Sequence, residues 1–276
     1  MKKWTKVLTT SILAVSLLAG CGSSSDQPSQ ASGGGDQVTK IKVGVTAGPH
    51  EEVMEKVKEV AAKDGLEIEI VAFNDYVQPN KVLAEGELDA NSFQHEPYLE
   101  RFKADHNLDL VKLANNINFP MGLYSTKIKD VSELEDGAQV GLPNDPTNGA
   151  RALQLFEEAG LIKLKEGVGV KATIHDIAEN PKNLKFKELE AAFIPKALDD
   201  LAVAAINTNF AMEHGYVPTK DSIFIEPSDS PWVNLIAVRT ADKDRPEFQK
   251  LVKAYHSDEV KKFIEEHFQG SVVPSW

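Results

Sequence analysis

The sequence predicts an α/β protein of two lobes with a cleft between them. Three observations lead to this prediction. Short apolar runs typical of strands alternate with amphipathic stretches at helical spacing. The alternation begins again after a Gly-containing segment at 120–124. The segment that can fold, from about residue 38 to 276, is long for one compact core and sufficient for two.

The first 20 residues have the composition of a secretion signal. Three lysines precede a mostly apolar run from Val7 to Leu18. That run is too short for a permanent membrane span, which needs about 20 residues. Small residues precede Cys21, where a signal peptidase would cut. We therefore predict a cleaved signal peptide over residues 1–20.

Cys21 is the single cysteine of the chain, so no disulfide can form within one molecule. Residues 18–21 read Leu-Ala-Gly-Cys, which resembles the lipobox, where the cysteine thiol receives a diacylglycerol. The alternative is a small buried thiol, but glycine and serines follow Cys21 directly. We expect Cys21 to be lipidated, residues 21–37 to form a flexible tether, and the protein to lie at the extracytoplasmic face of the cell membrane.

The charge of the chain excludes several partners. The net charge is -12 with His neutral, and the acidic residues are spread along the chain. Nucleic acid and anionic membrane surfaces are therefore poor partners, and the acidity favours solubility. No fixed-period repeat and no second hydrophobic span occur in the sequence. We expect a monomer without a cofactor.

The first lobe is predicted to follow the order β-α-β-α-β-α-β. A strand at 41–45 alternates apolar and polar residues and ends before the Gly48-Pro49 break. The helix that follows places four apolar residues on one face and ends near Gly65. The remaining elements are a strand at 66–73, a short helix at 81–86, a strand at 88–93, a helix at 95–105 and a strand at 108–113.

The second lobe is predicted to begin with another strand and helix. Its elements are a strand at 138–142, a helix at 148–159 and strands at 203–206 and 223–225. A run at 235–238 then leads to two amphipathic helices between Pro246 and Phe268, which we expect to return to the first lobe. We predict a first lobe of residues 38–122 plus 240–276 and a second lobe of residues 123–239. Largely parallel sheets would place a ligand beyond the carboxyl ends of the strands, in the cleft.

Five stretches resemble the NlpA family of lipoproteins, in the family's order and over nearly the whole mature chain. They are FNDYVQPN at 73–80, LDANSFQHEPYL at 88–99, PNDPTN at 143–148 with RAL at 151–153, AINTN at 205–209 and SPWVN at 230–234. The resemblance implies a periplasmic-binding-protein-like fold without enzymatic activity. It also implies a methionine ligand that is delivered to the permease and ATPase of an ABC importer, with L-methionine expected and D-methionine left open.

Three residues are candidates for the ligand's amino-acid group. A zwitterion needs a cation for its carboxylate and acceptors for its ammonium. Arg151, one turn into a predicted helix, can hold a carboxylate through two hydrogen bonds. Asn207 and Asn234 follow or end apolar runs, where an amide can both donate and accept. A solvated arginine and turn-forming asparagines are the alternatives, but the resemblance implies contacts with the ligand's backbone.

Four residues are candidates for the ligand's side chain: Tyr76, Phe93, His95 and Tyr98. A thioether is polarisable, and each good sulfur–aromatic contact contributes about 0.3–1.5 kcal/mol. The alternatives are core packing for Phe93 and a capping role for His95. Asn148 and Asn209 are expected to act only in turns.

A lipid-anchored hydrolase that uses His95 with Glu96, Asp75 or Asp89 is the alternative from another class. The chain lacks the Gly-x-Ser-x-Gly, His-Glu-x-x-His and phosphate-loop motifs. Its other histidines never pair at i, i+3 or i, i+4, so no metal site is predicted. Departures from the family pattern at Phe210 and Trp232 leave open methionine stereochemistry, methionine sulfoxide and a Met-containing dipeptide.

Overall fold

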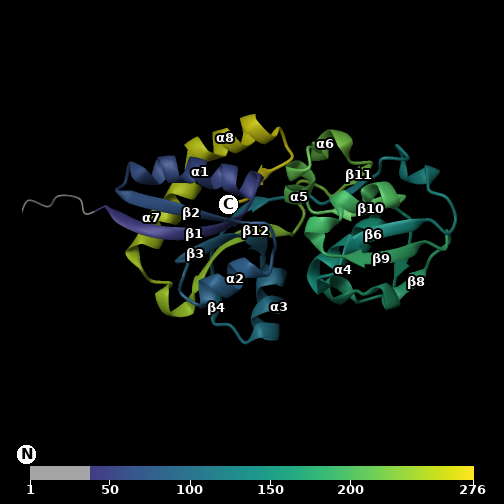
Figure 1. Cartoon of the computed structure of the whole chain (residues 1–276), viewed down its shortest axis with the longest axis horizontal. Helices are drawn as coiled ribbons and strands as arrows, with labels where there is room; N and C mark the ends of the chain where they lie inside the picture. The colour runs from purple at the N-terminus through teal and green to yellow at the C-terminus, as the bar shows by residue number, and fades with distance from the viewer. Residues whose placement is uncertain (1–37) are drawn as a thin grey trace, which may run out of the picture. The chain divides into compact units, whose positions relative to one another are not determined.

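The computed structural model describes residues 38–276, which build two β-sheets with their own helices (Figure 1). These residues lie within one compact unit that starts at Asp36. We call the six-stranded sheet and its helices the first lobe, and the five-stranded sheet and its helices the second lobe. The predicted signal peptide, Cys21 and the tether lie outside the described residues.

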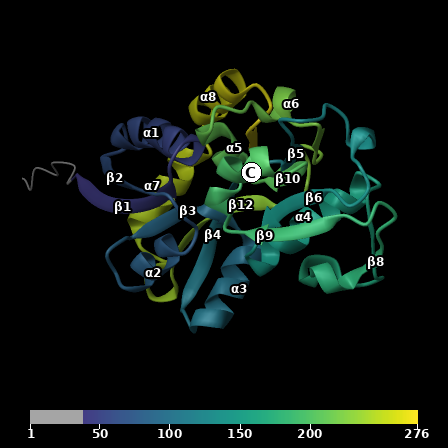
Figure 2. The ribbon, with the colours of Figure 1, turned by 45° about the vertical axis from the view of Figure 1, so that its right-hand side comes forward.

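The first lobe has the strand order β13-β4-β12-β3-β1-β2. Its strands are β1 (Thr39–Thr46), β2 (Leu66–Phe73), β3 (Ala90–His95), β4 (Leu110–Asn118), β12 (Val233–Arg239) and β13 (Val273–Pro274). Its helices are α1 (Pro49–Ala62), α2 (Gln78–Ala84), α3 (Glu96–His106), α7 (Pro246–Tyr255) and α8 (Asp258–Phe268). In both views α1 and α8 lie above this sheet and α2 and α3 below it (Figure 1, Figure 2).

Alternating side chains of one strand serve the two faces of the first sheet. Ile236 and Val238 of β12 belong to the core beneath α1, α7 and α8. Leu235 and Ala237 belong to the core beneath α2 and α3. This period of two is the reason why a strand buried on both faces reads as one continuous apolar run.

The second lobe has the strand order β11-β5-β10-β6-β9. Its strands are β5 (Gly122–Tyr124), β6 (Gln139–Pro143), β9 (Lys185–Leu189), β10 (Val203–Ile206) and β11 (Phe224–Ile225), with a separate pair β7 (Lys163–Leu164) and β8 (Ile177–Glu179). Its α-helices are α4 (Pro146–Glu158), α5 (Thr208–Glu213) and α6 (Pro218–Asp221). Six 3₁₀ helices complete the described chain: Val131–Glu133, Gly169–Lys171, Ile174–Asp176, Ala191–Phe193, Pro195–Asp200 and Thr240–Asp242.

The predicted elements occur in the predicted order, but β5, β7, β8, β9, β13, α5 and α6 were not predicted. The prediction of largely parallel sheets is wrong. β1 runs parallel to β2 and β3, whereas β12 runs antiparallel to both β3 and β4. In the second sheet β5 is the antiparallel strand, since it runs against both of its neighbours, β10 and β11. β3 ends at the cleft with His95, which pairs with Asn234 near the start of β12. A chain that returns from the other lobe enters at the cleft, so it must run against strands that end there.

The predicted lobe boundary at 239/240 places β12 in the wrong lobe, because Val233–Arg239 is hydrogen-bonded into the first sheet. The chain leaves the first sheet after Asn118 and enters the second at Gly122; it leaves again after Ile225. Residues 119–121 and 226–232 therefore connect the lobes. Across residues 38–276, none of the helices combines the length and apolar character that crossing a membrane would need.

Candidate ligand-binding site

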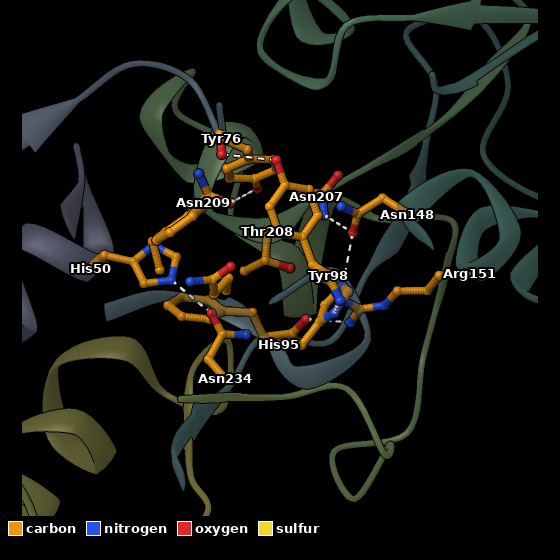
Figure 3. A pocket seen from close by; sticks show the side chains of 13 residues that line it. His50, Tyr76, His95, Tyr98, Asn148, Arg151, Asn207, Thr208, Asn209 and Asn234 are labelled. Carbon is orange, nitrogen blue, oxygen red and sulfur yellow. Dashed lines mark hydrogen bonds between the residues drawn. The ribbon is translucent and has the colours of Figure 1, made fainter. Parts of the chain in front are cut away.

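A pocket with an empty volume of about 350 Å³ lies between the lobes (Figure 3). The first lobe contributes His50, Tyr76, Phe93, Gln94, His95, Tyr98 and Asn234, the second lobe Asn148, Arg151, Asn207, Thr208 and Asn209, and the connection between them Phe119. β3 ends at His95, and β10 ends immediately before Asn207. The pocket thus lies beyond the carboxyl ends of strands from both sheets. All seven residues predicted from the sequence line it.

Three aromatic rings form a triangle at one side of the pocket. The ring centroids of Tyr76, Phe93 and Tyr98 are 6.0 Å apart in every pair. The Tyr98 hydroxyl donates to the backbone oxygen of Tyr76 at 2.8 Å, and burial raises the pKa of this phenol, so it stays neutral. His95 adds its ring edge-on, 6.3 Å from Tyr98. This surface is polarisable and almost free of charge, as an apolar or sulfur-containing group prefers.

Arg151 is not a solvated helix residue, because only 2% of it is exposed. Its Nε donates to Glu226 Oε1 at 2.8 Å, and its Nη2 donates to Glu226 Oε2 at 2.5 Å and to the backbone oxygen of Phe119 at 2.8 Å. We expected the guanidinium to bind a ligand carboxylate through two hydrogen bonds. Its Nε–Nη2 edge instead binds Glu226. Within residues 38–276, Nη1 makes no hydrogen bond and is the nitrogen left for a ligand.

Glu226 was not predicted from the sequence. It is an acidic residue in a connecting segment, 75 positions from Arg151, and no local pattern marks it. It also accepts from the backbone nitrogen of Met121 at 2.8 Å, and it is buried together with its partner. A buried ion pair of this kind holds the arginine in one position and compensates its charge.

His95 combines the capping role and the pocket role that the sequence left as alternatives. Its Nδ1 accepts from the backbone nitrogen of Tyr98 at 3.1 Å at the start of α3. Its Nε2 lies 3.2 Å from Asn148 Oδ1, to which the Asn207 side-chain nitrogen donates at 2.9 Å. Burial, and then the charge of Arg151, lower the pKa of His95 to about 3. The ring is therefore neutral.

His50 and Asn234 form a second buried pair in the first lobe. Thr46 Oγ1 lies 2.7 Å from His50 Nδ1, and His50 Nε2 lies 3.1 Å from Asn234 Oδ1. Burial lowers the pKa of His50 to about 4. The amide nitrogen of Asn234 points away from His50 (Figure 3), so it is available as a donor.

Six pocket residues were missed or given another role: His50, Gln94, Phe119, Asn148, Thr208 and Asn209. His50 lies in the first turn of α1, four positions after the carboxyl end of β1 at Thr46, and that position is the signal that could have found it. Asn148 and Asn209 lie in two of the stretches that resemble the family, but each was treated as a turn residue. Phe119 carried no signal, because it lies in the connection between two sheets.

The pocket offers hydrogen-bond donors, an unpaired acceptor and no acid–base pair. The acceptor is Asn207 Oδ1, which is buried without a hydrogen-bond partner. The carboxylate of Glu96, which a hydrolase would need beside His95, instead accepts from Lys112 at 2.5 Å and is exposed. In the described part of the chain, no three His, Cys, Asp or Glu residues lie together as metal ligands would. This arrangement suits the binding of a zwitterion better than catalysis.

The comparisons with known proteins all indicate the same family. The profile of the NlpA lipoprotein family matches residues 41–276. The D-methionine-binding lipoprotein MetQ of Escherichia coli K12 is 47% identical over 262 residues, which cover 94% of this chain and 93% of that protein. Outer membrane lipoprotein 3 of Mannheimia haemolytica is 45% identical over 242 residues, or 87% of this chain and 92% of that protein.

Solved structures with the same fold include a nutrient binding protein from Burkholderia cenocepacia bound to methionine. It is 50% identical, with a TM-score of 0.84, over 86% of this chain and 100% of that chain. An ABC transporter periplasmic substrate-binding protein from Coxiella burnetii is 43% identical, with a TM-score of 0.83, over 85% of this chain and 100% of that chain. The two-lobed binding-protein fold expected from the sequence is thereby confirmed.

Proposed function

The chain belongs to the NlpA lipoprotein family, and from that premise we propose that it captures methionine outside the cytoplasm and delivers it to an ABC importer. The observation that carries the proposal is one pocket that joins unpaired donors, an unpaired acceptor and an aromatic triangle. The donors are Arg151 Nη1 and the Asn234 amide nitrogen, and the acceptor is Asn207 Oδ1.

In this proposal each part of the ligand meets a complementary group. The carboxylate accepts from Arg151 and Asn234, and the ammonium donates to Asn207. The thioether lies against the rings of Tyr76 and Phe93, with Tyr98 and His95 completing that wall. Arg151 and Glu226 balance each other's charge in the pocket wall, which favours a ligand that is itself neutral overall.

Lobe closure is the step that we propose the transporter recognises. Tyr76 and His95 come from the first lobe, whereas Arg151 and Asn207 come from the second. A ligand that touches both sets binds the closed form better than an open form, and only that difference can shift the equilibrium between them. The implied partners are the permease and its ATPase. The protein would work as a monomer, anchored through Cys21, which lies outside the described residues.

We expect no chemical step in the pocket. His50 and His95 are both neutral and hydrogen-bonded on both ring nitrogens, and neither has a carboxylate beside it. Binding and release are then the whole activity of the site, and the alternative of an envelope hydrolase has no residue pair to support it.

Calorimetric titration of the chain from Gly22 onward tests the proposal. The protein is first unfolded and refolded to remove carried-over ligand. It is then titrated with L-methionine, D-methionine, methionine sulfoxide and glycyl-methionine. We expect tight binding of L-methionine, and the other three decide the open question of stereochemistry and oxidised or peptide forms. No heat from any of the four would contradict the proposal.

Substitutions at Arg151 and Phe93 show whether binding uses the assigned groups. Arg151→Ala removes charge-assisted hydrogen bonds, which contribute about 1.5–3 kcal/mol, so methionine affinity should fall roughly 10- to 100-fold. Phe93→Ala should cost less affinity, because it removes only one wall of the thioether site. Arg151→Lys serves as the variant that keeps the charge if Arg151→Ala is unstable. Equal small losses in all variants would contradict the assignment.

A further inference from the structure

The orientation of the Asn207 amide can be derived from the groups packed behind it. A side-chain amide has a donor end and an acceptor end, and its neighbours decide which end faces the pocket. The chain of neighbours runs from the backbone of Tyr98 through His95 to Asn148 and Asn207 (Figure 3). Asp145, at the start of α4, joins it at Asn148. Each link has only one consistent direction.

The first link sets the tautomer of His95. The backbone N–H of Tyr98 can only donate, and it points at His95 Nδ1 at 3.1 Å. Nδ1 must therefore be the acceptor of the neutral ring, which places the single proton on Nε2. Nε2 in turn donates to Asn148 Oδ1 at 3.2 Å.

The second link fixes the orientation of the Asn148 side-chain amide. Its amide nitrogen donates to Asp145 Oδ1 at 3.1 Å and to Oδ2 at 3.0 Å. An ionised carboxylate can only accept, so the nitrogen end of Asn148 must face Asp145. The same carboxylate accepts from the backbone of Asn148 at 2.9 Å and from the Thr147 hydroxyl at 3.0 Å, which fixes it at the start of α4. Asn148 Oδ1 therefore faces away from Asp145.

The third link fixes the orientation of the Asn207 side-chain amide. Asn148 Oδ1 accepts both from His95 and from the Asn207 nitrogen, the latter at 2.9 Å. A flipped Asn207 would bring two amide oxygens together. The amide oxygen of Asn207 is therefore left over, and it is buried without a hydrogen-bond partner. A buried acceptor without a donor is unfavourable until a donor arrives.

We propose that Asp145 and Asn148 are positioning residues that hold the Asn207 oxygen toward the ligand's ammonium. The inference rests on the proposed function and extends it, since it names the groups that make the pocket require an amine. The donors Arg151 and Asn234 then define the carboxylate end. Asp145 and Asn148 thereby set the orientation in which a zwitterion binds.

Asp145→Asn is the sharpest test, because asparagine is as good an N-cap as aspartate and keeps the start of α4. In place of Oδ2, its new amide nitrogen would oppose the amide nitrogen of Asn148, which keeps only its bond to Oδ1. Because His95 still holds Asn148 Oδ1, Asn148 is expected to shift and not to turn over, which displaces the Asn207 oxygen from the ligand's ammonium. L-methionine affinity should fall at least about tenfold, whereas 4-(methylthio)butanoate, which lacks the amine, should bind within about twofold of its wild-type affinity.

The titration is made at pH 8, because burial raises the pKa of the Asp145 carboxyl. Asp130→Asn is the matched control, since Asp130 also caps a helix start but is exposed and not part of the pocket. Asp130→Asn should change the affinity for neither L-methionine nor 4-(methylthio)butanoate. Equal losses for both ligands in Asp145→Asn would mean that Asp145 only supports the fold, and no loss would mean that Asp145 does not position the amides; either result overturns the inference.

A measurement without ligand separates this inference from the proposed function. The ¹⁵N shifts of the His95 ring in the free protein should show the tautomer protonated at Nε2. A ring protonated at Nδ1 would overturn the relay even if methionine binds. Failure of the wild-type protein to bind methionine would instead overturn the proposed function, while the ring shifts would still decide the hydrogen-bond directions.

Discussion

His50 and His95 stay neutral in the pocket wall because burial opposes their charged forms. Arg151 is equally buried but can remain charged, since Glu226 accepts two of its hydrogen bonds. The chemistry of each residue in this pocket is therefore set by its partner as much as by its type. The neutral histidines serve as fixed hydrogen-bonding groups, and they have a consequence for stability.

Because of His50, the free energy of unfolding should decrease as the pH falls. Its pKa is about 4 in the folded protein, below the ordinary value of 6.5, so the unfolded chain takes up the proton first as pH falls. The free energy of unfolding then decreases by up to about 1.4 kcal/mol per pH unit below pH 6.5. Urea unfolding at pH 7 and pH 5 measures this, and His50→Gln should make the decrease roughly 1–2 kcal/mol smaller. An unchanged decrease in the variant would contradict the prediction.

At the scale of elements, the position of α4 decides the site. This helix carries Asn148 and Arg151 in its first turns, with Asp145 as N-cap and Pro146 at its first position. Its start lies so close to β6 that a Cβ at Gly149 would be 2.9 Å from the backbone oxygen of Pro143. The glycine therefore permits the close approach that brings both polar side chains to the pocket.

Gly149→Ala should push the start of α4 away from β6. Backbone cannot yield as a flexible side chain does, so we expect a loss of about 1–3 kcal/mol in the free energy of unfolding. Methionine affinity should also fall, because Arg151 moves with the helix. Urea unfolding and calorimetry measure the two effects. Glu158→Ala, at the exposed end of the same helix, is the control, and normal affinity in Gly149→Ala would show that the helix position is not critical.

At the scale of the whole molecule, Tyr76 ties the lobes together. It follows β2 of the first lobe, yet its ring lies 4.8 Å from that of Phe210 in the second lobe. Its hydroxyl donates to Asn209 Oδ1 at 2.5 Å. The same side chain thus forms one wall of the pocket and one contact between the lobes, which would link occupancy of the pocket to the proposed closure.

Tyr76→Phe should weaken closure while it keeps the ring. The loss of one hydrogen bond, about 0.5–1.5 kcal/mol, should lower methionine affinity roughly 2- to 12-fold. Small-angle X-ray scattering should show a larger radius of gyration for the ligand-free variant than for the ligand-free wild type. Tyr216→Phe, within the second lobe and not part of the pocket, is the control. Equal radii and affinities in Tyr76→Phe and the control would contradict this role.

The sequence by itself determined the order of the longer strands and helices, the two-lobe plan and all seven proposed binding residues that line the pocket; it did not predict β5, β7, β8, β9, β13, α5 or α6. Apolar periodicity is a local property, so strands such as Leu66–Phe73 and Val203–Ile206 could be read residue by residue and appear with the same bounds in the structure. The binding residues were recognisable because they lie in the short contiguous stretches that resemble the NlpA family.

Only the tertiary structure decided strand direction, the lobe of β12, the Arg151–Glu226 pair and the direction of the Asn207 amide. Each depends on where distant segments meet. β12 runs antiparallel because the chain returns at the cleft, and Glu226 reaches Arg151 from 75 positions away. Hydrogen-bond direction at Asn207 follows from a chain of neighbours in both lobes. Local sequence patterns carry no information about such contacts, since the physical cause lies in packing between segments.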